Sequence, residues 1–124
     1  MELNVFFKSV LEQDRAPIVI CDLDDTIIYM NPAAANSEAK HGGYALLGKN
    51  LLECHSERSR MAIKKVVEWF RADKAHNIVH TFHNDKVDKD VYMVALRDGA
   101  GELIGYYEKH EFRGREQAPR YDLS

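Results

Sequence analysis

The sequence predicts an α+β domain built on a single antiparallel sheet. Two short apolar runs, residues 18–21 and 27–30, flank a carboxylate-rich break and are typical of a β-hairpin. Three longer extended runs follow near the end of the chain, at 77–84, 91–97 and 102–112, and the short turn sequences between them favour antiparallel pairing. Because the strands gather at both ends of a helical middle, the pattern lacks the βαβ crossovers of a parallel sheet. We therefore expect five strands in one antiparallel sheet.

Length and composition narrow the class of protein. A chain of 124 residues suits one domain, and 45% hydrophobic and 30% charged residues are globular values. The formal net charge of −3 gives no basic face to neutralise phosphates, which argues against a nucleic-acid partner. No apolar run approaches the roughly 18 residues that span a bilayer. Residues 1–4 also lack the basic start of a signal peptide. We expect a cytoplasmic protein without a membrane partner.

The first element is an amphipathic helix over residues 2–14. Its apolar side chains recur at three- and four-residue spacing and form one stripe. The stripe either packs on its own domain or forms the contact of a homodimer, and two Phe side chains are a large apolar area for a terminal segment. The stripe consists of Leu3, Phe6, Phe7, Val10 and Leu11.

A second helix is expected after the hairpin. Asn31 can cap it with Pro32 at its first position, which is a favoured pairing. The helix should continue towards His41 and end at the glycine pair 42–43. Residues 44–52 then predict short helical turns and connectors.

The longest helix is predicted over residues 56–75. Ser56 is a good N-cap residue, and Glu57 is favourable near the positive end of a helix. The apolar positions that follow have helical spacing and form one stripe. These positions are Met61, Ile63, Val66, Val67 and Phe70.

The carboxylates of the first hairpin permit two interpretations. An apolar strand that ends in Asp22, Asp24 and Thr26 resembles the first motif of haloacid dehalogenase-like phosphatases, in which the first Asp is the nucleophile and the second the general acid/base. That resemblance implies a magnesium-dependent enzyme with a parallel sheet. Against it, the chain turns straight into a second strand, and Asp88 and Asp90 lie in a hairpin break. The alternative is a structural turn.

Five landmarks in order resemble the PAS domain family, over about residues 17–112. Asp25 replaces the usual turn glycine, and residues 109–112 stand where sensor kinases often continue with Asp-Ile-Thr. The resemblance implies a sheet curled around short helices and a central helix, with helices on one face. The landmarks are the hairpin 22–27, the helix start 31–34, the segment 43–49, His55-Ser56, and Leu96-Arg97-Asp98 with Gly101 and Gly105.

This resemblance implies a sensory or signalling module without catalysis of its own. It divides the chain into an N-terminal helix (1–16), a PAS-like domain (17–113) and a C-terminal tail (114–124). The gap between sheet and helices commonly holds a small molecule in such domains, and a signalling partner would be contacted in trans. The remaining alternative is a ligand-free interaction module with a filled core.

The residues leave the identity of a cofactor unknown. Light-sensing flavin relatives need Cys directly after the Asn of their motif, whereas Leu51 follows Asn50 here. Haem relatives often supply a His from the central helix, which has none over residues 56–75. His55, with Cys54 beside it as a soft donor, is the best candidate ligand. The other role for His55 is a backbone hydrogen bond that orients the turn before the helix.

The third strand supplies the last pocket candidate. Strict alternation places Ile78, His80 and Phe82 on one face, which is the more apolar and the better inward candidate. The same alternation sends His80 and His83 to opposite faces, so we expect no metal site there. The candidate cofactor-binding residues are therefore Cys54, His55 and Phe82.

Overall fold

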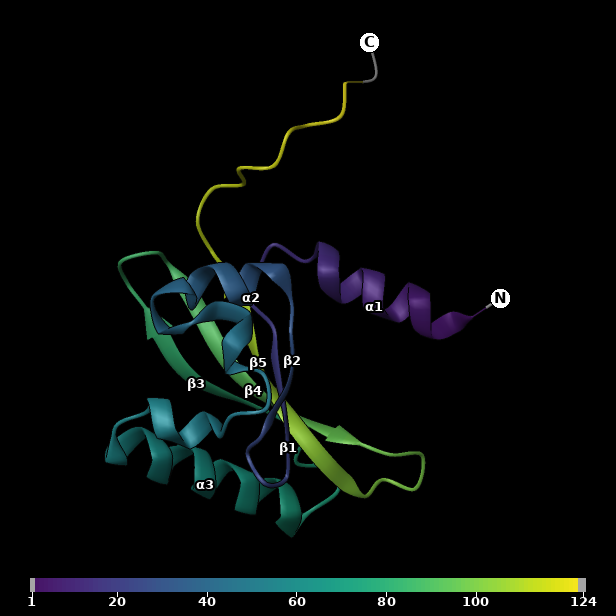
Figure 1. Ribbon diagram of the computed structural model, residues 1–124, viewed down its shortest axis with the longest axis vertical. Coiled ribbons are helices and arrows are strands. Elements are labelled where there is room, and N and C mark those ends of the chain that lie inside the picture. Colours follow the sequence, from purple (N-terminus) through teal and green to yellow (C-terminus); the bar gives the residue numbers. More distant parts are fainter. Residues whose placement is uncertain (1, 123–124) are drawn as a thin grey trace.

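One antiparallel sheet of five strands forms the body of the molecule. The computed structural model of the chain describes residues 2–122. The strand order is β2-β1-β5-β4-β3, and every neighbouring pair is antiparallel, which confirms the predicted α+β sheet (Figure 1). The strands are β1 (Val19–Asp22), β2 (Ile27–Met30), β3 (Ile78–Asn84), β4 (Lys89–Arg97) and β5 (Leu103–Phe112).

Helices cover one face of this sheet, while the N-terminal helix α1 (Leu3–Gln13) extends away from it (Figure 1). The predicted cap residues are confirmed, since the side chains of Asn31 and Ser56 accept hydrogen bonds from the backbone N–H groups of Ala34 and Ser59. No helix among residues 2–122 is long and apolar enough to cross a bilayer. The covering helices are α2 (Pro32–Ser37) and α3 (Glu57–Ala72), with the 3₁₀ turns η1 (Ala39–His41), η2 (Gly43–Leu46) and η3 (Leu51–Cys54).

Helix α2 is shorter than the sequence predicts. It ends at Ser37, and the chain then tightens into 3₁₀ turns, with the N–H of His41 donating to the carbonyl of Glu38. Gly42 follows at a φ of 112°, a left-handed conformation that glycine adopts without a Cβ penalty. The tightened segment turns Glu38 and His41 towards the sheet, where they line a cavity described below.

The hydrophobic core lies between α3 and the inner face of the sheet. Phe70 of α3 is fully buried, as the helical stripe predicts. It packs with Cys21 and Tyr106, which β1 and β5 place on the same face. Burial of large side chains at these positions holds the central helix against the sheet. The buried members of the hydrophobic core are Cys21, Ile27, Met30, Ala34, Leu46, Val67, Phe70, Met93 and Tyr106.

The first hairpin is a structural turn. The Oδ1 atom of Asp22 accepts hydrogen bonds from the backbone N–H groups of Asp24, at 2.9 Å, and of Thr26, at 3.0 Å. Asp25 takes the left-handed conformation expected of the residue that replaces glycine, with a φ of 62°. Its carboxylate accepts a hydrogen bond of 2.6 Å from the hydroxyl of Tyr106. Since the two strands that flank this turn are antiparallel, the sheet is not that of the phosphatase alternative.

A β-bulge in β3 overturns the predicted alternation. The register shifts between His80, which pairs with Tyr92, and Phe82, which pairs with Val91, so Thr81 is the extra residue. The prediction that His80 and His83 lie on opposite faces is therefore wrong. Both rings reach Oδ1 of Asp90, each at 2.8 Å. Strict alternation could not reveal this, because one inserted residue reverses the face of every side chain beyond it.

Candidate functional site

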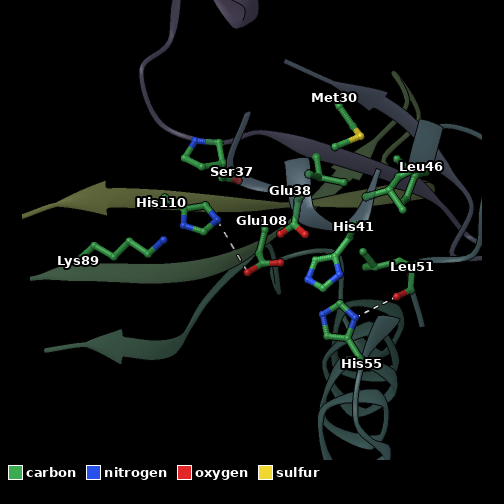
Figure 2. Close-up of a pocket in the computed structure, with 13 residues that line it drawn as sticks. Met30, Ser37, Glu38, His41, Leu46, Leu51, His55, Lys89, Glu108 and His110 are labelled. Carbon is green, nitrogen blue, oxygen red and sulfur yellow. Dashed lines mark hydrogen bonds and ion pairs between the residues drawn. The ribbon is translucent and has the colours of Figure 1, made fainter. Parts of the chain in front are cut away.

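A cavity of about 440 Å³ lies between the sheet and the short helical segments. Strands β1, β2, β4 and β5 form one side, and the end of α2 with the three 3₁₀ turns forms the other. Its volume is in the range of small-molecule sites. Apolar side chains of β2, η2 and η3 share the lining with six ionisable residues (Figure 2). These are Glu38, His41, His55, Lys89, Glu108 and His110.

His55 has the predicted backbone contact and also lines the cavity. Its Nδ1 atom lies 2.9 Å from the carbonyl oxygen of Leu51. Because a carbonyl can only accept, Nδ1–H is the donor, and in the neutral ring Nε2 has a lone pair available as a hydrogen-bond acceptor or ligand atom. The backbone hydrogen bond before the helix and a role as a cofactor ligand are therefore compatible. That His55 binds a cofactor stays a prediction.

The other two candidates are placed differently. The side chain of Cys54 lies outside the described part of the chain. Phe82 is 56% exposed on the edge strand β3 and is not among the described residues that line the cavity. Leu51, at the position where the flavin relatives have their reactive Cys, faces the cavity with an unreactive side chain.

Strand β5 presents two ionisable side chains to the cavity, Glu108 and His110. Desolvation by the surrounding protein raises the pKa of Glu108. The charges of His55 and Lys89 oppose this rise, and the charge of Glu38 adds a smaller one. Desolvation also lowers the pKa of His110 to about 4, with a smaller contribution from Lys89. At neutral pH the imidazole of His110 is thus neutral. It lies beside the carboxylate of Glu108, whose charged form is disfavoured by its surroundings.

The contact between these two side chains is loose. Nε2 of His110 lies 3.8 Å from Oε1 of Glu108, which is longer than a hydrogen bond. Nδ1 of His110 is buried, and no described group forms a hydrogen bond with it. Glu108 keeps 40% of its side-chain surface accessible because it faces the cavity. Its carboxylate is therefore available to a bound molecule.

Of the six ionisable residues that line the cavity, the sequence predicts only His55. Alternation along β5 could have indicated two of them, since Tyr106, Glu108 and His110 share a face and Tyr106 is buried in the core. Glu38 and His41 gave no such signal, because the 3₁₀ turns that orient them have no side-chain periodicity.

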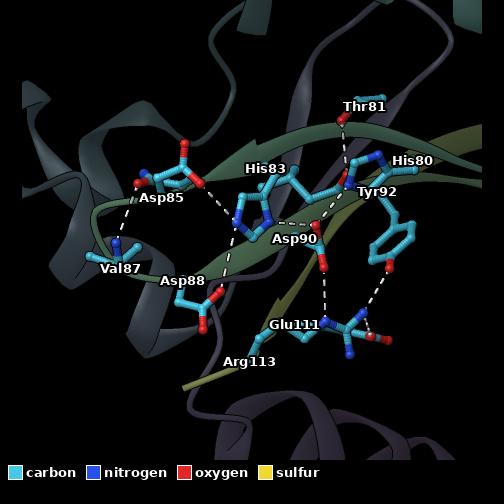
Figure 3. Close-up of polar contacts among 12 residues, drawn as sticks. His80, Thr81, His83, Asp85, Val87, Asp88, Asp90, Tyr92, Glu111 and Arg113 are labelled. Atoms are coloured by element: carbon cyan, nitrogen blue, oxygen red, sulfur yellow. Dashed lines mark hydrogen bonds and ion pairs between the residues drawn. The ribbon is translucent and has the colours of Figure 1, made fainter. Parts of the chain in front are cut away.

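The opposite face of the same strands carries a cluster of ion pairs around Asp90 (Figure 3). Its Oδ2 atom accepts a hydrogen bond of 2.8 Å from Nε of Arg113, and its Oδ1 contacts His80 and His83. The Arg113 contact, followed by those of the two histidines, holds the pKa of Asp90 well below its usual range. Arg113 also donates to the hydroxyl of Tyr92 at 2.8 Å, so the residue that follows β5 is bound to β4.

Acid should destabilise the wild-type protein through His110. Its folded pKa of about 4 is below the unfolded value of roughly 6.5. Below pH 6.5 the unfolded chain therefore binds a proton that the folded chain refuses, and stability is lost as the pH falls towards 4. Between pH 7 and pH 5 we expect wild type to lose about 2 kcal/mol more than His110→Gln. Urea unfolding at both pH values measures this difference, and equal losses would contradict it.

No protein-family model matches the chain, and no curated protein matches it significantly. Solved structures do match. The C-terminal domain of a Streptococcus mutans protein is 25% identical with a TM-score of 0.66, and the match covers 86% of this chain and 81% of that one.

Two other matches have lower sequence identity. The PAS domain of a Colwellia psychrerythraea protein is 12% identical with a TM-score of 0.64, covering 90% of this chain and 97% of that one. The Aer2 receptor of Vibrio cholerae, a dual PAS-heme oxygen sensor, is 17% identical with a TM-score of 0.54, covering 79% and 94%. At such identities the likeness shows the fold.

Proposed function

Because the chain has a PAS-like fold, we propose that it is a sensory or signalling module whose cavity binds a small ligand. The observation that carries the proposal is the cavity of about 440 Å³ with its ionisable lining, since a purely structural core would exclude such groups or pair them. His55 contributes its free Nε2 as a ligand contact. The module has no catalysis of its own and acts in the cytoplasm on a partner in trans.

Native mass spectrometry of the gently purified full chain tests for a ligand. We expect a bound species of small mass that disappears on denaturation, and an absorption spectrum identifies any haem or flavin. The matched variant is Ser37→Trp, which fills the cavity from the end of α2 and should be isolated without the species. Bare chain from both proteins would favour the ligand-free interaction module instead.

The fold offers a route from the ligand to the tail. Lys89 and His110 face the cavity, and their chain neighbours Asp90 and Glu111 point to the opposite face of the sheet. Both of these carboxylates bind Arg113, at 2.8 Å and 2.6 Å. A ligand that displaces Lys89 or His110 would therefore act on the ion pairs that hold the start of the tail. This is how the proposed module would transmit its signal.

We further propose that α1 forms a homodimer with a second copy. None of its residues is buried, and its largest apolar side chains are at least half exposed, which is costly for a monomer in water. A two-fold contact would pair the same stripe of both helices. The exposed members of the stripe are Leu3, Phe6, Phe7 and Val10, and Val5 of the same helix is exposed as well.

The double variant Phe6→Ser/Val10→Ser tests this contact. It removes two apolar side chains from the stripe. We expect sedimentation equilibrium to give the mass of one chain for the variant and of two chains for wild type. The dissociation constant of the dimer should be at least tenfold higher for the variant. Lys8→Ser, on the opposite side of α1, is the control and should remain a dimer. A monomeric wild type at 100 µM would contradict the proposal.

A further inference from the structure

We infer that the ligand of this cavity is a small organic cation that carries a protonated amine. The inference rests on the proposed function, because it assigns the chemistry of the molecule that the same cavity would bind. It starts from three hydrogen-bond acceptors that face the cavity from different elements: the carboxylates of Glu38 and Glu108, and Nε2 of His55. Figure 2 shows these side chains directed towards a common space.

The charged form of Glu108 is disfavoured in this cavity. Burial raises the pKa of Glu108 and the charge of Glu38 adds a smaller rise, so its carboxylate would gain from a cation in direct contact with it. An ammonium group has three N–H donors and no acceptor. It could therefore bond both carboxylates and the lone pair of His55 at once. A neutral hydroxyl or a carboxylate ligand would leave at least one of these acceptors without a donor.

The protein neutralises this part of the cavity only from a distance, since the charges of His55 and Lys89 lower the pKa of Glu108 without forming an ion pair with it. No described residue forms an ion pair with Glu38, and among the described residues the ion-pair contact of Glu108 is the loose one with His110, at 3.8 Å. His110 is neutral at pH 7 because of its lowered pKa. The ammonium group of Lys89 lies over the ring of Phe112, 5.7 Å from its centroid, and makes no ion pair with either carboxylate. A cationic ligand would give the two carboxylates the close partner that these residues do not.

Two further observations favour an organic cation over a metal ion. No group of three metal-binding side chains with suitable geometry is found within the described part of the chain. Apolar side chains, among them Met30, Leu46 and Leu51, also line the cavity and would contact a hydrocarbon chain. An aliphatic amine satisfies both the acceptors and this apolar surface.

Three probes of similar size test the inference on the isotope-labelled chain at pH 7: n-butylammonium, butyrate and n-butanol. We expect saturable changes in amide NMR shifts near Glu38, His55 and Glu108 with butylammonium, and binding at least tenfold weaker with the other two. Glu108→Gln and Glu38→Gln should each weaken butylammonium binding about tenfold or more. Glu53→Gln, an exposed residue of η3, is the matched control and should bind as wild type does.

The outcomes separate this inference from the proposed function. Since Glu108→Gln removes a carboxylate whose charged form is disfavoured by burial, its Tm should not fall, and lost binding would not mean lost folding. Equal or tighter binding of butyrate or butanol would overturn the amine assignment. So would a native mass spectrum whose bound species carries no amine, although the proposed sensory function would stand. If no probe binds and the native chain is bare, both fail.

Discussion

Replacing Asn31 by aspartate is expected to lower the free energy of unfolding by about 4 kcal/mol. Asn31 is fully buried and uses every hydrogen-bonding position of its amide. Its Oδ1 accepts from the N–H groups of Ile18 and Ala34, both at 2.9 Å. Its Nδ2 donates to the carbonyls of Leu11 and Ala16, both at 3.0 Å, and to a third carbonyl, that of Asp14, at 3.3 Å.

The substitution replaces the hydrogen-bond donor of the Asn31 side chain, Nδ2, with an acceptor oxygen. An aspartate keeps the two accepted hydrogen bonds, but its second oxygen faces three carbonyl oxygens without a proton to donate. The result is a buried charge with like dipoles around it, one of the few ways in which a single change removes most of the stability of a domain. Asn31 connects α2 to the end of α1 and to residues 14–18, which link α1 to β1. We therefore also expect α1 to detach from the domain.

Urea unfolding followed by circular dichroism measures the loss, and hydrogen exchange of the α1 amides measures the detachment. The matched control is Asn36→Asp in the same helix α2, where the side chain is exposed and the change should be within 0.5 kcal/mol of wild type. A variant Asn31→Asp with unaltered urea midpoint would show that water reaches the site.

Asn31 also shows how far sequence reasoning extends. Its role as the cap of α2 is predictable because the cap and the helix are adjacent in the chain. The three carbonyls it binds lie 15 to 20 residues earlier and become neighbours only when the linker folds onto β1 and β2. Local patterns therefore find one half of its interactions, and the other half depends on tertiary structure.

The same distinction applies to the elements and to the candidate site. Periodic burial predicts α3 and the strands, with bounds close to those observed, because each has one face on the core. The bulge at Thr81 and the 3₁₀ turns that orient Glu38 and His41 have no periodic signal, since strand pairing and chain reversal decide them. His55 is predictable because it precedes the predicted N-cap residue Ser56. The other ionisable residues of the cavity are not among the predicted site residues.

Gly105→Ala is the second change with a large expected effect, a loss of about 3 kcal/mol or more. Gly105 lies in the centre of the sheet, where β5 pairs with Asp22 of β1 on one side and Leu96 of β4 on the other. A Cβ atom at this position would lie 2.3 Å from the carbonyl oxygen of Cys21 and 3.4 Å from Cα of Asp22. Real Cβ atoms essentially never come within 3.0 Å of other atoms.

The clash cannot be relieved cheaply because the atoms it meets belong to backbone. A flexible side chain could rotate away, but moving the carbonyl of Cys21 disturbs the pairing of β1 with β5 and the hairpin that holds Asp22. Differential scanning calorimetry should give a Tm lower by about 12 °C. Gly99→Ala is the matched control, since its Cβ would meet nothing within 4 Å, and its Tm should remain within about 2 °C of wild type. If the Tm of both variants equalled that of wild type, β1 and β5 would have to separate by more than the sheet spacing allows. The close packing of these central strands would then be wrong.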